Sequence, residues 1–575
     1  MSVDADHSVN LAHSPFQVYL HTNYIPTDSE IPCIDAHLKP HEAELGRLDS
    51  LIQDLTERRS RVKAYIESHR ALLSLPRRLP RDVLEGIFAA CLPLERNPIM
   101  SAEQVPLLLG RICSAWRTVA FSMPKLWAAL HISLAFIASR TVRKLAMLDW
   151  LERSAPLPLN LSMWFTPDIP GCHHIFHLLL RFSLRWGALS ISNITHEDFQ
   201  KMAQMKSPLL ENLKVAYLNV NDWRGLEVAA NANADGIDAE KGSTILSGPL
   251  FRGMKKACIG FSLRDLNVLV PATPFSWDHL EHLTLVLRVD RQSFDIDPLA
   301  FPLSTTNVFR LLRGCKNLCS LRVSLAVLES PDAWITEVLV LPSLVSLVLI
   351  IGGMAIPAEG FTESTYFVNF MEHLIIPHLD IFRVLHSEWM ALGVGLMIGD
   401  PVLTHLATHS PSLSQLCIPL STIATATSLQ TLRLFSCLTQ LELRFGIPPE
   451  NPLMGGDIET NDTLVVSLGP DTDMPNPFPA LRELCIRCLI QDEIWVNLAE
   501  NQLKYHTKLQ DLHIYNGVER PNVVLDVGNF RARGLNVWVE YTVPRRKQLP
   551  SSGLTVWSGF EDKCFIVPAS WDPWL

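Results

Sequence analysis

The chain has 575 residues, of which 48% are hydrophobic and 19% are charged, and its formal net charge is −10 at pH 7. A chain of this length exceeds one hydrophobic core, so several domains or a repeat array are expected. The apolar content excludes extensive disorder, and the acidic balance provides no overall field that favours nucleic acid. The first thirty residues show no secretory signal, so the 12 cysteines are expected to be reduced thiols of a cytoplasmic and/or nuclear protein.

The N-terminal region divides into a leader and a long helix. Residues 1–36 are polar and turn-rich, which predicts an irregular leader. Residues 37–73 carry a heptad pattern that is typical of a coiled-coil helix. Its seam consists of Leu38, Leu45, Ile52, Ile66 and Leu73 at one position and Leu48, Leu55 and Val62 at another. Arg59 and His69 interrupt the seam, so the pattern leaves open whether the helix pairs with a second copy or folds back on its own chain.

Residues 74–128 have the pattern of a compact helical module. A helix is expected to start at Leu79-Pro80, because proline at the first helical position loses no needed hydrogen bond. Apolar residues at helical spacing follow, namely Val83, Leu84, Ile87, Phe88 and Cys91. A polar break and then a second apolar stripe complete the module, with Leu108, Ile112, Trp116 and Val119 in the stripe. The first stripe is interpreted either as an ordinary core helix or as a helix that docks a partner.

The remainder of the chain repeats a six-residue phrase, Leu-x-x-Leu-x-(Leu/Ile/Val). It occurs at 210–215, 280–285, 318–323, 344–349, 413–418, 429–434, 438–443, 481–486 and 509–514, with weaker copies at 157–163, 186–191, 379–384 and 533–539. Such a phrase places alternate apolar side chains on one face of a short strand. The fold class predicted is therefore α/β, with an irregular leucine-rich-repeat solenoid over residues 129–575.

Three features depart from a regular repeat. The phrases at 429–434 and 438–443 are too close for successive parallel strands, so one of them is expected to be a hairpin partner or part of a connection. Excursion loops are predicted near 231–247 and at 446–479. The aromatic tail at 558–575 is interpreted either as a cap for the solenoid or as a second docking peptide.

One stretch raises the question of a membrane helix. Residues 338–358 carry no charge over a length that can span a bilayer. Pro342 and Pro357 interrupt the stretch, and its middle fits the strand phrase. The sequence therefore predicts a strand here and no membrane segment.

No motif predicts catalysis, a cofactor or a metal. His173, His174 and His177 lie close together, but a zinc site needs further ligands that no neighbouring motif supplies. Cys485 and Cys488 form a single Cys-x-x-Cys within and just beyond a strand phrase, which favours core packing. Two aspartates in 471–475 are interpreted as part of a solvated turn. A metal-dependent enzyme centred on His173 and His177 remains a remote alternative.

The module at 74–128 resembles an F-box. The resemblance lies in Leu79-Pro80-x-Asp82-Val83-Leu84-x-x-Ile87-Phe88, then Ile112-Cys113-x-x-Trp116-Arg117-x-Val119-Ala120, then Leu126-Trp127. The order of leader, heptad helix, F-box and degenerate leucine-rich repeats is similar to an arrangement abundant in mushroom-forming fungi. Two departures are visible: Asp82 replaces the more usual Glu, and segment 93–104 is longer than in a minimal F-box.

This resemblance implies a non-catalytic subunit of an SCF-type (cullin-RING) E3 ubiquitin ligase. Its F-box would bind a Skp-type adaptor, and its repeats would hold a protein target. The residues implied in the adaptor contact are Leu79, Pro80, Val83, Leu84, Ile87 and Phe88, whereas Cys113, Trp116 and Trp127 would pack the module or contact the adaptor. The alternative is a leucine-rich-repeat scaffold that recruits no ligase.

Overall fold

The computed structural model describes most of the chain. The described residues are 14–73, 78–94, 96–166, 169, 171–216, 248–261, 277–287, 304–326, 334–352, 365–386, 399–420, 422, 426–444, 458–470, 476–488, 490–516 and 527–541. The chain divides into two compact units, residues 1–87 and 88–575. The predicted excursion near 231–247, the aspartates of 471–475 and the tail at 558–575 lie outside the described residues.

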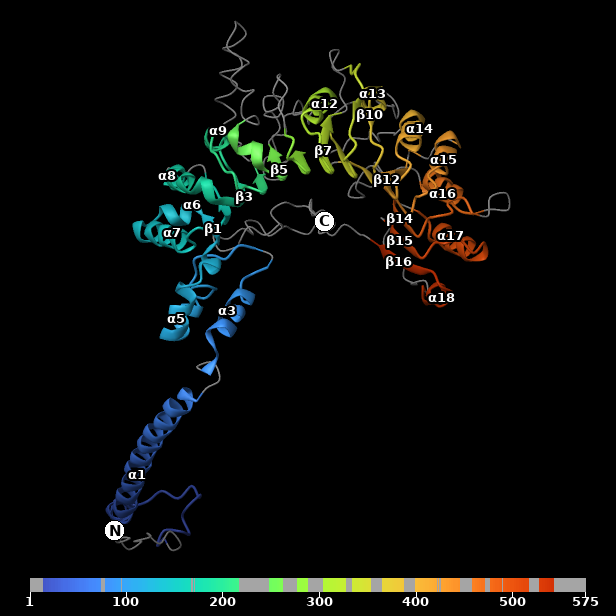
Figure 1. Cartoon of the computed structure of the whole chain (residues 1–575). Helices are drawn as coiled ribbons and strands as arrows, with labels where there is room; N and C mark the ends of the chain where they lie inside the picture. Colours follow the sequence, from blue (N-terminus) through green and yellow to red (C-terminus); the bar gives the residue numbers. More distant parts are fainter. Residues whose placement is uncertain are drawn as a thin grey trace. The chain divides into compact units, whose positions relative to one another are not determined.

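The first unit contains the long helix α1 (Ile31–Leu72), shown in blue in Figure 1. The helix begins six residues before its predicted start because a capping box precedes it. The Thr27 amide donates a hydrogen bond to the Glu30 carboxylate at 2.8 Å, and the Thr27 carbonyl accepts one from the amide of Ile31 at 3.2 Å. The end of the leader is therefore ordered as a helix cap, which corrects the expectation of an irregular segment up to residue 36.

Helix α3 (Arg81–Ala90) crosses the boundary, and the second unit then alternates helices and strands. The helices of eight or more residues are α5 (Ser114–Phe121), α7 (Thr141–Arg153), α8 (Gly171–Leu179), α9 (His196–Ala203), α12 (Thr305–Arg313), α13 (Thr365–Glu372), α14 (Asp400–His409), α16 (Ile458–Ser467) and α17 (Asp492–Lys504). Shorter helical segments are α4 (Leu109–Ile112), η1 (Pro124–Trp127), α6 (Leu134–Ala138), η2 (Leu180–Arg185), η4 (Pro249–Gly253), α15 (Ala426–Leu432) and α18 (Gly528–Ala532).

Fourteen strands of the described residues form one parallel sheet in chain order. They are β1 (Ala129–Ser133), β2 (Leu159–Trp164), β3 (Trp186–Ser192), β4 (Asn212–Ala216), β5 (Lys256–Phe261), β6 (His282–Leu287), β7 (Ser320–Ala326), β9 (Ser346–Gly352), β11 (Ile381–His386), β12 (Gln415–Pro419), β13 (Gln440–Arg444), β14 (Glu483–Cys488), β15 (Asp511–Asn516) and β16 (Asn536–Tyr541). The small strands β8 (Leu339–Val340) and β10 (Leu374–Ile375) pair separately.

The register of the sheet follows the leucines of the repeated phrase. The second leucine of one phrase pairs with that of the next, as Leu283 does with Leu321 and Leu321 with Leu347. The same row continues through Leu416, Leu441, Leu484 and Leu512. These side chains are 0–2% exposed, so one face of every strand is held in the core. The prediction that the phrases form parallel strands is confirmed for all but one of them, and the weaker copies form β2, β3, β11 and β16.

The exception is the phrase at 429–434, which lies mostly in helix α15, whereas the phrase at 438–443 forms β13. The predicted assignment of one of them to a connection is confirmed. The predicted excursion at 446–479 is corrected in part, because helix α16 occupies Ile458–Ser467. Strands β1 and β5 carry no leucine phrase and were not predicted from one.

The uncharged stretch at 338–358 contains β8 and β9 in its described part. None of the helices in the described residues combines the length and the apolar character that crossing a membrane requires.

Candidate functional site

Helix α3 carries two pairs of apolar residues, one buried and the other exposed to solvent. Leu84 is 6% exposed and Phe88 is fully buried, whereas Val83 and Ile87 are 42% and 39% exposed. Each pair is spaced by four residues, so each defines one stripe along the helix. The helix therefore buries one apolar stripe and leaves the neighbouring apolar stripe in contact with solvent.

The start of α3 differs slightly from the prediction. The helix begins at Arg81, and Pro80 lies just before it with its carbonyl accepting a hydrogen bond from the Leu84 amide at 3.1 Å. Pro80 is exposed and Leu79 is half-buried. Asp82 lies in the first turn, where its negative charge is favourable beside the helix N-terminus.

The second part of the module is built around Trp116 and Trp127. The Phe88 ring lies 5.0 Å from the Trp116 ring, and the Cys113 sulfur accepts a hydrogen bond from the Trp116 amide at the start of α5. Trp127 is 1% exposed, and its indole nitrogen donates to the Ala120 carbonyl at 2.9 Å. Cys113, Trp116 and Trp127 therefore all make packing or capping contacts within the second unit.

Trp127 also packs this module against helix α7 of the sheet region. Its ring meets Trp150 of α7 edge-on at 4.9 Å and Phe121 at 5.5 Å. The Arg153 guanidinium lies over Phe121 and Trp127, at 4.1 and 5.0 Å from the ring centroids. The end of the module and the start of the sheet thus share one aromatic cluster.

Segment 93–104, which the sequence predicts as a polar break, pairs with the edge of the sheet. Ile99 forms a parallel bridge with His131 of β1, and the His131 amide donates to the Pro98 carbonyl at 2.8 Å. The Asn97 side chain donates to Ser162 of β2 at 3.1 Å. Ile99 is 5% exposed. Residues 97–99 of this segment therefore cover part of the first strand.

Burial changes the chemistry of His131. Its ring is 6% exposed and its Nδ1 lies 3.0 Å from the Ser162 hydroxyl. Burial lowers the pKa of His131 to about 4, and the cationic Arg96 nearby acts in the same direction. His131 is therefore neutral at physiological pH.

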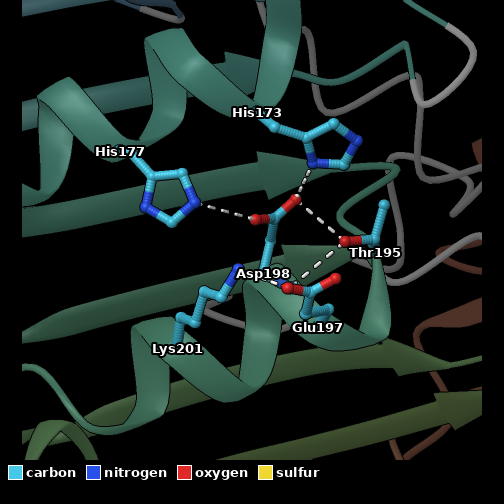
Figure 2. A network of polar contacts seen from close by, with 6 residues as sticks. All are labelled: His173, His177, Thr195, Glu197, Asp198 and Lys201. Carbon is cyan, nitrogen blue, oxygen red and sulfur yellow. Dashed lines mark hydrogen bonds and ion pairs between the residues drawn. The ribbon is translucent and has the colours of Figure 1, made fainter. Parts of the chain in front are cut away.

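The histidines at 173–177 meet a buried carboxylate from another helix. Figure 2 shows His173 and His177 of α8 on one side of Asp198, which is 1% exposed and lies on α9. His173 Nδ1 is 2.5 Å from Asp198 Oδ2, and His177 Nε2 is 3.8 Å from Oδ1. The Thr195 hydroxyl donates to Asp198 at 2.8 Å and accepts from its amide, which caps α9.

This network holds two helices together rather than opening a reactive site. The Asp198 carboxylate is occupied by side chains of the chain itself, and His174 turns away to Lys144 at 2.8 Å. In the part of the chain that the structure describes, no group of three His, Cys, Asp or Glu side chains is placed to hold a metal ion. The geometry therefore favours a structural role for the histidines.

The two cysteines at 485 and 488 do not act as a pair. Two residues lie between them along β14, so the cysteines are three positions apart and their side chains point to opposite faces of the strand. Burial raises the pKa of each thiol to about 12, which keeps both protonated at neutral pH. The cysteines of the described residues are all free.

The face of the sheet opposite the leucine rows carries a charge cluster that the sequence analysis did not predict. Glu442 of β13 binds Arg444 at 2.8 Å and Arg487 of β14 at 2.7 Å. Arg487 also lies over the Tyr515 ring at 3.7 Å. Burial alone would raise the pKa of Glu442, but the two guanidinium groups outweigh it and lower the pKa. The sequence feature that could have indicated this charge cluster is the row of polar residues that alternate with the leucines of each phrase.

Comparison with known proteins identifies no family. No protein-family model matches the chain, and no curated protein matches it. Among solved structures, the chain is similar to one described as "Crystal structure of Rad7 and Elc1 complex in yeast", with 11% identity and a TM-score of 0.31 over 83% of this chain and 96% of that chain. A TM-score of this size does not establish a shared fold.

Proposed function

We propose that this chain is the substrate-recognition subunit of an SCF-type E3 ubiquitin ligase. In this proposal residues 74–128 are an F-box that docks to a Skp-type adaptor, and the parallel sheet region is an irregular leucine-rich-repeat solenoid that holds a protein target. The adaptor joins the chain to a cullin and a RING protein. The chain itself performs no chemistry and needs no cofactor, and a cytoplasmic or nuclear location suits this role.

The observation that carries the proposal is the division of α3 into a buried and an exposed apolar stripe. Val83 and Ile87 match F-box positions implied in the adaptor contact, and both expose about two fifths of their surface. Leu84 and Phe88 supply the core beneath them. An exposed apolar stripe on a short helix is a feature that a partner surface accounts for, whereas scattered single apolar residues need no such account.

The arrangement of the strands in the sheet region suits the binding of a protein target. Parallel strands in chain order leave an extended face with different side chains in every repeat, which suits recognition of a protein segment. The polar side of β13–β15, with Glu442, Arg487 and Tyr515, is the first surface to test for this role. A target held there would be tethered near the ubiquitin-loaded enzyme, so transfer would benefit from a raised effective concentration.

The test is co-purification of the full chain with a Skp-type adaptor. Two variants are compared with the native chain: Val83→Asp/Ile87→Asp, which places charges on the exposed stripe, and Val142→Asp/Leu145→Asp as a matched control. Val142 and Leu145 are 76% and 60% exposed aliphatics on α7, far along the chain from the predicted contact. Circular dichroism confirms that all three proteins are folded.

We expect the native chain and the α7 variant to retain the adaptor and the α3 variant to lose it. If the native chain does not bind any Skp-type adaptor, the ligase proposal is overturned and the scaffold alternative replaces it. Equal loss of binding in both folded variants would show that the effect of the α3 substitutions is not specific to this stripe, and would also contradict the assigned contact.

A further inference from the structure

Helix α1 presents an apolar seam to solvent, interrupted at Arg59. Six of its aliphatic side chains are between 40% and 62% exposed, namely Leu45, Leu48, Ile52, Leu55, Val62 and Ile66. They occupy the a and d positions of a heptad, with Leu45, Ile52 and Ile66 at a. The leader contacts the helix near its beginning, where the Phe16 ring lies 6.1 Å from His37, and leaves these six residues exposed.

Charges flanking the seam are divided between the two halves of the helix. The first half has Glu42 and Asp49 at e positions and Glu44 at a g position, whereas the second half has Lys63 and Arg70 at e and Arg58 at g. Side chains at e and g lie beside the seam and meet the partner helix. Glu44 already binds Arg47 at 2.8 Å, and Lys63 lies 3.8 Å from Glu67 in an exposed pair. Asp49 is therefore a more informative acidic residue than Glu44, and Lys63, whose exposed pair with Glu67 is long, is the basic residue at the matching e position of the second half.

This division disfavours a parallel pair of identical helices. In register, each g residue meets the following e residue of the other copy, so Glu44 would face Asp49 and Arg58 would face Lys63. The a-position Arg59 would also meet its own counterpart inside the seam. Both effects place like charges together, which destabilises the pair.

An antiparallel pair removes most of these conflicts and leaves one like-charge contact, at the g positions, where Arg58 meets its own counterpart. When a positions pack on d positions in the opposite direction, Ile52 meets Val62 and Leu48 meets Ile66 of the other copy. In the same alignment Arg59 meets an apolar Leu55, from which its long stem can reach solvent. The e positions of the two helices then bring Asp49 beside Lys63, and this contact occurs twice by symmetry.

We infer that α1 forms an antiparallel two-helix coiled coil with a second copy of this chain. The pairing covers six exposed aliphatic side chains of each copy, twelve in all, and the charge pattern favours the antiparallel orientation. This interface goes beyond the proposed ligase role and does not depend on it, because no residue of α3 takes part. A dimer would present two target-binding regions, so that multivalent targets would be held more tightly than by either alone.

The experiment is sedimentation equilibrium of the full chain over a range of concentrations, with three charge variants. They are Asp49→Lys, Lys63→Asp and the double variant Asp49→Lys/Lys63→Asp. Asp54→Lys is the matched control, because Asp54 lies at a c position away from the seam. A fifth protein, Ile52→Asp/Leu55→Asp, removes the apolar contact, and circular dichroism tests that each variant is folded.

We expect the native chain and the Asp54 variant to dimerise with similar affinity. Each single seam-flanking variant should weaken dimerisation by about tenfold, because two attractive contacts become repulsive, and the double variant should restore it. The Ile52→Asp/Leu55→Asp variant should be monomeric. A parallel dimer would give the opposite sign, since Asp49→Lys would relieve the clash with Glu44 and tighten the dimer. That result, a dimer insensitive to all charge changes, or a native chain that stays monomeric would overturn the inference.

Discussion

The pairing between segment 96–101 and the edge of the sheet should weaken as the pH falls, and His131 sets the size of the effect. The pKa of His131 is about 4 in the folded chain, compared with about 6.5 for an exposed histidine. Well above pH 6.5 the ring is neutral in both states and contributes no pH dependence. Between pH 6.5 and 4 the ring binds a proton mainly in the opened form, so lowering the pH shifts the equilibrium towards the opened form.

The pKa difference allows the magnitude to be worked out. A gap of roughly 2.5 pKa units corresponds to about 3 kcal/mol once the pH has fallen below 4, and to about 2 kcal/mol at pH 5. Local opening of β1 should therefore be about twentyfold more frequent at pH 5 than at pH 7. Global unfolding is a poor measure in a chain of many repeats, because repeats need not unfold together.

Hydrogen exchange of the amides at 129–133, corrected for the intrinsic effect of pH, measures this opening directly. The reporter is the His131 amide, which donates to the Pro98 carbonyl. The variant His131→Phe keeps a buried ring but cannot bind a proton, so its opening should not change between pH 7 and pH 5 beyond the background of other groups. If the native chain and the variant show the same pH dependence, the assigned role of His131 is wrong.

Three further outcomes follow from the described contacts. Val83→Ala/Ile87→Ala should weaken adaptor binding by about tenfold in calorimetry without lowering thermal stability, because burying the remaining 40% of each side chain is worth about 1 kcal/mol. Trp127→Phe should destabilise the module by about 1–3 kcal/mol in denaturant titration, because the Ala120 carbonyl loses its shorter hydrogen bond and keeps the longer one from the Met123 amide at 3.4 Å, and because part of the buried indole is removed. Asn516→Leu should raise hydrogen exchange around residue 490 strongly, because its amide both donates to and accepts from that backbone.

The strands were predictable because their pattern is local. Alternation of apolar and polar residues places Leu321 and Val323 on one face whatever the rest of the chain does, and both are fully buried in β7. The phrase of the same pattern at 429–434 lies mostly in helix α15 instead. No strand position remains for this phrase, because β12 already pairs with β13. Competition for a place in the sheet is a tertiary effect that a single phrase does not contain.

The candidate site was predictable only in part for a related reason. The spacing of Val83, Leu84, Ile87 and Phe88 fixes two stripes on α3, but the sequence cannot say which stripe stays exposed. The histidines at 173–177 gave no hint of Asp198, since their partner is on a different helix and is recognised only once α8 and α9 pack. Contacts between elements, rather than patterns within them, decide these roles.

The segment between the two predicted helices of the module shows how such contacts change the meaning of a departure from a family pattern. A parallel sheet exposes unpaired amides and carbonyls at its first strand, and such an edge invites pairing with other chains. Ile99 and Pro98 cover part of this edge at β1, and Asn97 reaches past it to β2. Shortening 93–104 would therefore uncover the edge even if the exposed stripe of α3 stayed intact. The length of this segment therefore contributes to the stability of the sheet edge. Its effect on the docking of a partner is a separate property.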